Sequence, residues 1–395
     1  MHLLHNQLDG CEAKLDSMAY TQKKHSRTRA AETGHQQLGT ISPAAELMVA
    51  AKSVVSVRSM EAGQIALMSQ EELGRVFFII GFGVTAPDCP LPCGFMSVAL
   101  PALCGSAPYE VWLADQSVSR GSPTQTDGIG FAKTDHVLFG CAAITQGDDD
   151  HLEDITEALY RQIFDCMDGA GMRHFSRAWH YLPAINSAEQ SLERYRRFSM
   201  GRHEAFVAKG RQIERDAPAA SALGSKSMPA QAAQLVIYFI ATALPGTPIE
   251  NPRQLSAYKY PLQYGPKSPT FARAFLAPSP QDIFYVSGTA SIVGHETLHA
   301  GDVRAQTRET IANIGSLTSE GEKQGAHKIG DTRRATHIKV YVRHADDIAV
   351  VREEVEAAFA GGRPVEIVYF EADICRRDLL VEIELLNCAP AGSQP

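Results

Sequence analysis

The 395-residue sequence lacks several features that would place it in whole classes of protein. It has no apolar run long enough for a membrane-spanning helix, and its polar N-terminus lacks the apolar core of a signal peptide. Positive charge is also scarce, because 37 Lys and Arg stand against 45 Asp and Glu, a net charge of −8. We therefore predict a cytoplasmic protein that binds neither membranes nor nucleic acid.

Cysteine is sparse too, and its spacing indicates neither a disulfide framework nor a zinc site. The chain has 8 Cys scattered over its whole length. Cys89 and Cys93 are separated by a short proline-containing segment, but no second pair matches them. We expect reduced thiols, as is usual in a cytoplasmic protein.

One metal-binding motif is present, because residues 295–299 read HETLH and match H-E-x-x-H. In a zinc peptidase both imidazoles must lie on one face of a helix, so that the intervening glutamate can activate the metal-bound water. Gly294 and Gly301 enclose the motif and leave about six residues, under two turns of helix. A zinc peptidase stays an alternative. We prefer the interpretation that His295 and Glu296 form hydrogen bonds that shape a turn.

The pattern of apolar residues predicts an α+β chain. Residues 1–45 are polar and are expected to form a disordered tail. Apolar and β-branched runs predict strands, and 3.6-residue periodicity predicts helices. The expected strands are 75–82, 95–100, 110–114, 136–144, 173–182, 235–241, 282–286, 337–342, 365–370 and 379–386, and the expected helices are 155–167, 187–209, 303–314 and 346–359.

The order of these elements indicates two copies of one unit. Strand, helix and strand follow one another over residues 136–182 and again over 337–370. A segment rich in Pro, Ala and Ser, residues 216–228, is interpreted as the connection between them. We therefore expect one domain over 46–225 and a second over 226–395.

Three segments attract attention as candidate binding regions. The loop over 252–274 interleaves tyrosines with cations and prolines, which suits a small cyclic anion or a purely structural loop equally well. Arg202 follows a helical glycine and lies either near a ligand or on a solvated face. Glu382 and Glu384 alternate with apolar residues, so both carboxylates share one face of a strand. If that face closes a pocket, one of them is a buried acid with a raised pKa.

Taken together, these segments resemble the chorismatase family, also labelled pteridine-dependent deoxygenase-like. The resemblance covers roughly residues 75–386, and its motifs are Tyr195 to Arg202, the 252–274 loop, SGTASIVGHE over 287–296, and Cys375 with VEIE over 381–384. It implies two tandem domains of the Rid-like (enamine/imine deaminase) fold, with the site in the C-terminal domain. It also implies that the HETLH match is fortuitous.

The resemblance implies a metal-free and cofactor-free reaction that releases pyruvate from chorismate. Glu382 would be the acid that protonates the enolpyruvyl group, which requires a carboxyl group that is neutral at pH 7. Arg202 and Arg273 would bind the two carboxylates. Tyr260 and Tyr264 would hold the ring or the ether oxygen.

Product choice divides this family at two positions, occupied here by Gly288 and Cys375. Glycine and cysteine resemble the members that form 3-hydroxybenzoate, and nothing in the sequence decides whether some 4-hydroxybenzoate accompanies it. Simple hydrolysis to the dihydroxycyclohexadiene carboxylate is one alternative, and a non-catalytic module that binds small acids is another. From the residues alone, the favoured interpretation of Cys375 is a small buried apolar residue. Monomer and trimer both stay open.

Overall fold

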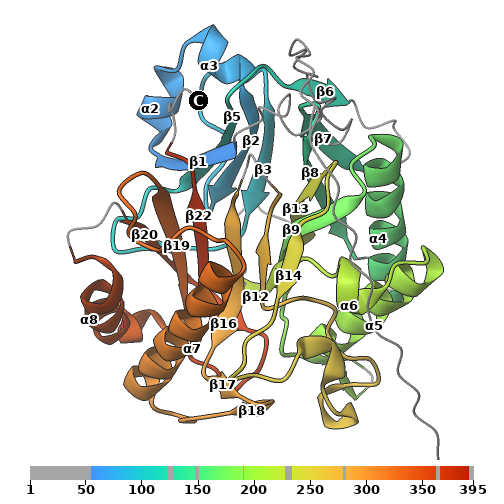
Figure 1. Ribbon diagram of the computed structural model, residues 1–395, viewed down its shortest axis with the longest axis vertical. Coiled ribbons are helices and arrows are strands. Elements are labelled where there is room, and N and C mark those ends of the chain that lie inside the picture. Colours follow the sequence, from blue (N-terminus) through green and yellow to red (C-terminus); the bar gives the residue numbers. More distant parts are fainter. Residues whose placement is uncertain are drawn as a thin grey trace, which may run out of the picture. The chain divides into compact units, whose positions relative to one another are not determined.

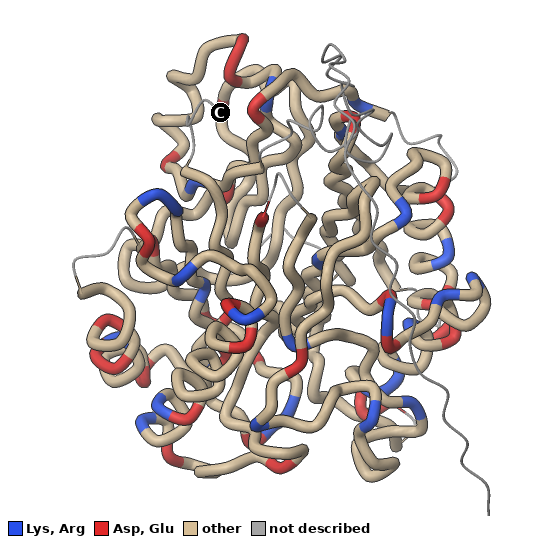
Figure 2. Tube along the Cα trace, in the orientation of Figure 1, with Lys and Arg blue, Asp and Glu red and all other residues tan. Residues whose placement is uncertain are grey.

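The computed structural model describes residues 55–121, 128–146, 151–189, 191–226, 234–278, 282–361 and 365–390. The expected N-terminal tail, residues 1–45, lies outside these ranges. Within them, none of the helices combines the length and the apolar composition that crossing a bilayer requires. Acidic and basic positions are interspersed along the described chain (Figure 2).

The first repeat has a mixed sheet with helices on its outer side (Figure 1). Its strands occur in the order β6-β7-β8-β13-β9-β12, and β9 and β12 are parallel. Its elements are β6 (Ser119–Gly121), β7 (Ile129–Lys133), β8 (Val137–Thr145), α4 (Leu152–Gly169), β9 (His174–Pro183), α5 (Arg194–Ala208), β12 (Ala219–Ser225) and β13 (Gln234–Thr242), with the short α6 (Ile213–Asp216) and the hairpin β10 (Ala188–Glu189) and β11 (Leu192–Glu193).

The second repeat has the same topology, because its strand order is β14-β15-β16-β22-β19-β20. In each repeat a three-stranded meander is followed by helix, strand, helix, strand and a final strand. This final strand, β13 in the first repeat and β22 in the second, inserts at the centre of the sheet. Its elements are β14 (Thr247–Ile249), β15 (Ala274–Leu276), β16 (Phe284–Ala290), α7 (Val303–Lys323), β19 (Ala335–Val342), α8 (Ile348–Phe359), β20 (Val365–Glu371) and β22 (Val381–Cys388), with three 3-10 turns, η1 (Ala257–Lys259), η2 (Leu262–Tyr264) and η3 (Ala345–Asp347), and the hairpin β17 (Ile292–Val293) and β18 (Glu296–Thr297).

A third sheet precedes the two repeats. Its strand order is β1-β5-β2-β3, and two short helices cover its outer face. Its elements are β1 (Val55–Met60), α2 (Ala62–Ala66), α3 (Gln70–Gly74), β2 (Val76–Phe82), β3 (Gly94–Val98) and β5 (Tyr109–Ala114). These strands fall within the range predicted for the first domain, and they pair with one another in a sheet of their own.

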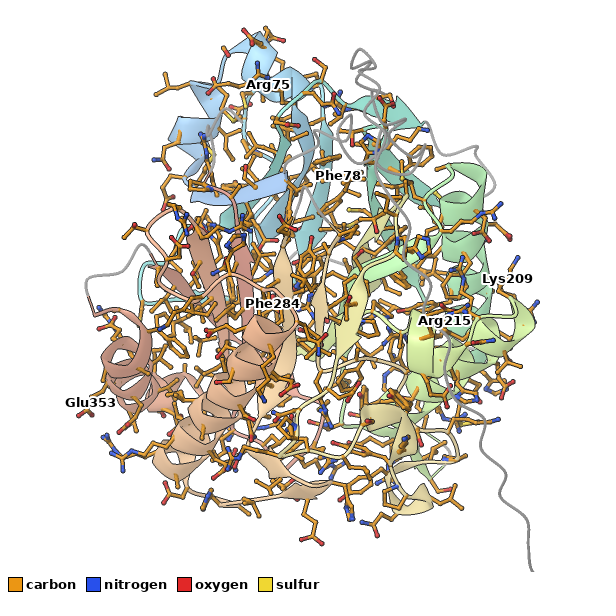
Figure 3. All side chains as sticks on the ribbon, in the orientation of Figure 1. Arg75, Phe78, Lys209, Arg215, Phe284 and Glu353 are labelled. Atoms are coloured by element: carbon orange, nitrogen blue, oxygen red, sulfur yellow. The ribbon has the colours of Figure 1, made fainter. Side chains whose placement is uncertain are left out.

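The three sheets share one hydrophobic core between their inner faces, while each packs helices against its outer face. Phe78 of β2, Trp179 of β9 and Tyr285 of β16 come from different sheets and meet in the shared core. Phe284 of β16, labelled with Phe78 in Figure 3, points the other way and packs beside α7. Strand alternation therefore gives each sheet an inner face toward the other sheets and an outer face toward helices.

Two short strands link the sheets. β4 (Ala102–Leu103) pairs with β20 and extends the second repeat's sheet, whereas β21 (Asp373–Ile374) pairs with β12 of the first repeat. β21 therefore brings the segment that starts at Cys375 against the first repeat.

Most of the predicted elements are confirmed, and the errors concentrate around the connection between the repeats. The expected loop over 216–228 contains β12, and the strand expected to open the second half is β13, which pairs with β8 and β9 of the first sheet. The alanine and serine residues of β12 do not form the run of large apolar residues that predicts a buried strand from sequence, although their small size allows close packing. We therefore propose that the boundary between the repeats lies after Thr242 and not at 225. The expected helix over 187–209 begins only at Arg194.

Candidate active site

The candidate site lies between the two repeats and consists of two adjoining cavities. The empty space, including the part open to solvent, is about 600 Å³ in the wide cavity and about 390 Å³ in the narrow cavity. The residues that line both cavities are Tyr195, Pro269, Phe271, Gly288, Cys375 and Glu382.

All seven predicted site residues lie on these walls. Both cavities are lined by Gly288, Cys375 and Glu382. The wide cavity alone is lined by Tyr260, Tyr264 and Arg273, and the narrow cavity alone by Arg202. The sequence analysis placed the site in the C-terminal domain and added Arg202 from the N-terminal domain, and in the structure Arg202 belongs to α5 of the first repeat.

Glu382 is a buried carboxyl group at the junction of the two cavities. It lies on β22, its exposed fraction is 3%, and no hydrogen bond or ion pair joins its carboxyl to another described residue. Burial raises its pKa to about 8, and the negative charge of Glu384 acts in the same direction, against Arg177 and Arg273. At pH 7 the side chain is therefore mostly protonated and can donate a proton.

Gly288 leaves room for the Glu382 side chain, because the backbone at position 288 passes directly beside the Glu382 carboxyl group. A Cβ atom at 288 would lie 1.9 Å from Glu382 Oε1 and 3.1 Å from Ser221 Oγ. The register of β16 against β22 shifts between Val286 and Thr289, so this glycine occupies an irregularity in the ladder. Any larger residue would displace the acid.

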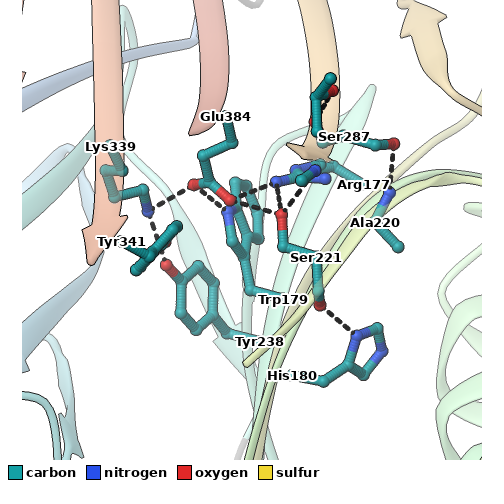
Figure 4. Close-up of polar contacts among 12 residues, drawn as sticks. Arg177, Trp179, His180, Ala220, Ser221, Tyr238, Ser287, Lys339, Tyr341 and Glu384 are labelled. Atoms are coloured by element: carbon teal, nitrogen blue, oxygen red, sulfur yellow. Dashed lines mark hydrogen bonds and ion pairs between the residues drawn. The ribbon is translucent and has the colours of Figure 1, made fainter. Parts of the chain in front are cut away.

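Glu384 faces the same interior but is surrounded by donors (Figure 4). Its carboxylate accepts hydrogen bonds from Arg177 Nη2 at 2.7 Å, Trp179 Nε1 at 2.7 Å and Ser221 Oγ at 2.5 Å. Lys339 Nζ lies 3.1 Å away. Burial alone would raise its pKa, but these charges and hydrogen bonds outweigh burial and lower the pKa. Glu384 is therefore ionised.

Cys375 lies directly after β21, where the chain passes from the first sheet to the second. Burial and the nearby Glu382 raise the pKa of its thiol to about 12. The group is therefore a neutral thiol at pH 7 and not a thiolate nucleophile.

Arg202 is a buried cation without an anionic partner in the described part of the chain. Its exposed fraction is 3%, and its guanidinium lies 5.2 Å from the centroid of the Tyr160 ring. Nε and Nη2 are buried and meet no hydrogen-bond acceptor among the described residues. Gly201 beside it is required by close contact, because a Cβ there would lie 2.0 Å from the carbonyl oxygen of Glu153. An anion in the narrow cavity would satisfy this guanidinium.

The 252–274 loop supplies the wall of the wide cavity. Arg273 donates from Nη2 to the carbonyl oxygen of Leu255 at 2.8 Å and to the hydroxyl of Tyr260 at 2.6 Å, while its Nε meets no acceptor among the described residues. The rings of Tyr260 and Tyr264 are 5.2 Å apart. Both tyrosines therefore line the wide cavity, and this position favours a binding loop over a purely structural one.

The HETLH segment does not form the helix that a zinc peptidase needs. Glu296 and Thr297 form β18, and His299 has a positive φ of 58°. His295 Nδ1 lies 3.2 Å from the hydroxyl of Tyr264, whereas His299 Nε2 lies 3.5 Å from a carboxylate oxygen of Glu309. The two imidazoles engage different partners, so these residues do not fit a zinc site, and the hairpin supports the pocket wall.

The sequence analysis missed three residues of the site. Tyr195 was named only as the first residue of the Tyr195 to Arg202 motif, without a role of its own, although it lines both cavities. Ser221 lines the narrow cavity and lies in the segment interpreted as a loop. Arg376 lines the wide cavity. The only sequence signal for Arg376 is its position next to Cys375.

Comparisons with known proteins agree with this geometry. Residues 110–241 match the family model described as chorismatase FkbO/Hyg5-like, N-terminal. The chain is 38% identical over 285 residues to a 3-hydroxybenzoate synthase of Streptomyces hygroscopicus, covering 70% of this chain and 80% of that protein. It is 38% identical over 286 residues, with the same coverage, to a chorismatase of Streptomyces rapamycinicus. A crystal structure of a chorismatase has a TM-score of 0.72 at 30% identity, covering 85% of this chain and 98% of that chain.

The matches also bear on the fold. The N-terminal family model ends at residue 241, next to the end of β13, which supports a boundary after Thr242. The duplicated topology and the match to a solved structure confirm the predicted α+β fold with tandem Rid-like units.

Proposed function

This chain belongs to the chorismatase family, and from that premise we propose that it converts chorismate to 3-hydroxybenzoate and pyruvate. The observation that carries the proposal is the buried carboxyl group of Glu382, whose pKa of about 8 keeps it protonated at pH 7 between two cavities that contain unpaired arginines. The reaction requires such a group, because an enol ether is cleaved after protonation of its carbon.

The proposed first step is transfer of the Glu382 proton to the terminal methylene of the enolpyruvyl group. The product is an oxocarbenium ion, and Glu382 is left as a carboxylate. The C3–O bond then breaks, and its electron pair becomes part of the carbonyl group of pyruvate. The hydroxyl oxygen on C4 bonds to C3, and its proton returns to Glu382, so the acid is regenerated.

The resulting arene oxide aromatises without a further reactant. Its C4–O bond opens, the hydrogen on C3 is lost as a proton, and the oxygen retained on C3 gains a proton. The atoms of chorismate are then fully divided between 3-hydroxybenzoate and pyruvate, and no water is consumed. Attack by water at the same stage would instead give the dihydroxycyclohexadiene carboxylate.

Arg202 and Arg273 are proposed to bind the two carboxylates of chorismate, one in each cavity. Both guanidinium groups are buried, and both retain N–H groups without an acceptor among the described residues. Desolvated arginines strengthen such charge-assisted hydrogen bonds. Gly288 and Cys375 border the acid and are proposed to leave too little room for water, which favours the aromatic product.

The test is incubation of purified, chelator-treated protein with chorismate, followed by chromatography and a pyruvate assay. We expect 3-hydroxybenzoate and pyruvate in equal amounts, and the fraction of the 4-isomer is measured in the same run. The diene diol would overturn the aromatising reaction but keep pyruvate release. Unreacted chorismate would overturn the proposed function.

A further inference from the structure

We propose that Arg376 is a third substrate-binding arginine, which binds one carboxylate of a dicarboxylate substrate together with Arg273. The inference rests on the proposed function for the identity of the substrate. Arg376 lies in the segment between β21 and β22, directly after Cys375, and lines the wide cavity that also contains Arg273 and Glu382.

The guanidinium of Arg376 is held against two aromatic rings. Its Cζ lies 4.1 Å from the ring centroid of Tyr264 and 5.2 Å from that of Tyr260. Arg273 lies 5.5 Å from the same Tyr260 ring. Both cations therefore lie around one tyrosine, and contact with the two rings helps to hold the Arg376 guanidinium in place before any ligand binds.

The hydrogen bonds of Arg376 fix one side of the guanidinium and leave the other available. Nη1 donates to the carbonyl oxygen of His295 at 2.8 Å and to Thr297 Oγ1 at 3.3 Å. Nη2 is buried and meets no acceptor among the described residues. The HETLH hairpin thus positions this arginine, which gives that segment a role unrelated to metal binding.

Among the described residues, the charges around the wide cavity leave Arg376 without a counterion. The carboxylate of Glu193, on the wall of this cavity, already forms an ion pair with Arg196, whose Nε lies 3.4 Å from Glu193 Oε2. Glu382, the other carboxyl group on the wall, is protonated at pH 7. No ion pair within the described ranges involves Arg376, so a bound carboxylate would supply the missing negative charge and the missing acceptor.

The positions of the three arginines explain how a compact dianion is bound by one carboxylate on each side of Glu382. Arg202 lies in the narrow cavity and Arg273 and Arg376 in the wide one, while Glu382 borders both. A ligand with two carboxylates would place its reacting group between them. A ligand with one carboxylate would use only one end of the site and would bind more weakly.

The test compares Arg376→Gln with Arg377→Gln, which removes the same charge at an exposed neighbour outside the cavities. We expect the KM for chorismate to rise about 10- to 100-fold in the first variant, with a smaller change in kcat, and to stay nearly constant in the second. Arg376→Lys keeps the charge but not the planar stacking, so its KM should lie between the two. Equal KM values for the two Gln variants would overturn the inference.

A binding experiment separates this inference from the proposed reaction. Calorimetry with benzene-1,3-dicarboxylate and with benzoate measures how strongly the wild type prefers two carboxylates. We expect Arg376→Gln to lose most of that preference, while Arg377→Gln keeps it and thermal denaturation shows both variants folded. If the wild type does not react with chorismate but Arg376→Gln still loses the preference, the proposed function fails and the binding role stands. An unchanged preference overturns the binding role whatever the reaction.

Discussion

Glu382 and Glu384 lie on the same strand and face, and both have an exposed fraction of 3%, yet the structure gives them opposite charge states. The pKa of Glu384 is lowered because Arg177 and Lys339 are close and Ser221 and Trp179 donate to it. The pKa of Glu382 is raised to about 8 because burial is not compensated by any such partner. Burial alone therefore does not decide the charge of a carboxyl group, and the number of donors does.

The comparison also assigns a task to each group. Glu384 is an ionised structural partner that joins the two repeats, since Arg177 and Trp179 belong to β9 of the first one. Its negative charge in turn raises the pKa of Glu382. One strand thus places a fixed anion beside an acid and helps to keep that acid protonated.

The strongest test of this difference is Glu382→Gln. Glutamine has the same shape but no acidic proton, so we expect kcat/KM for pyruvate release to fall by about 10²- to 10⁴-fold. The fold should persist, because Glu382 is already neutral at pH 7 and forms no ion pair with a described residue. Steady-state pyruvate assays and a thermal denaturation curve check the two statements. Near-normal turnover would remove Glu382 from the mechanism.

Glu384→Gln should act through stability and through the acid. Removing one member of a buried ionic network costs about 3–5 kcal/mol, because Lys339 and Arg177 lose a compensating charge. The same change removes the negative charge that raises the pKa of Glu382, so that pKa falls. In the wild type the protonated acid is lost as pH rises through about 8. The alkaline decrease in kcat/KM should therefore move to lower pH in the variant.

Glu110→Gln is the matched control for that measurement. Glu110 Oε2 lies 2.6 Å from Lys339 Nζ, so its loss should also destabilise the protein. Glu110 is not among the charges that shift the pKa of Glu382. A pH profile unchanged in Glu110→Gln and shifted in Glu384→Gln would separate the two effects. Equal profiles in both variants would mean that Glu384 does not set the pKa of the acid.

The sequence predicted that the two glutamates share one face of a strand, but it did not predict that their charge states differ. Strict alternation around Glu382 and Glu384 predicted one shared face, and the resemblance to chorismatases pointed to Glu382. Arg177 comes from the first repeat, and Lys339 comes from another strand of the second repeat, more than 40 residues before Glu384. No local sequence pattern connects either residue to Glu384. Ser221 was missed because β12 consists mainly of small residues. Partners that come together only through sheet packing have no signature in a single sequence.

Cys375→Ala should alter the products more than the rate. The thiol borders Glu382 and stays neutral, because its pKa is raised to about 12. Alanine removes volume and a weak hydrogen-bond donor, so we expect water to compete and the diene diol to increase relative to 3-hydroxybenzoate. Cys375→Ser keeps a neutral donor and should lie nearer the wild type. Chromatography of the products is the measurement, with Cys141→Ala in the shared core as control. An unchanged product ratio would exclude the thiol from product choice.

Ser221→Ala should have the smallest effect and separates charge from hydrogen bonding around the two glutamates. The hydroxyl donates to Glu384 and accepts from Arg177 and from the backbone N–H of Gly288 at 3.0 Å. Its loss should cost about 0.5–1.5 kcal/mol of stability, as for a typical hydrogen bond. Glu384 keeps Arg177, Trp179 and Lys339 and should remain ionised, so the alkaline decrease in kcat/KM should stay at the wild-type pH. A shift as large as in Glu384→Gln would mean that the hydroxyl, and not the neighbouring anion, keeps Glu382 protonated.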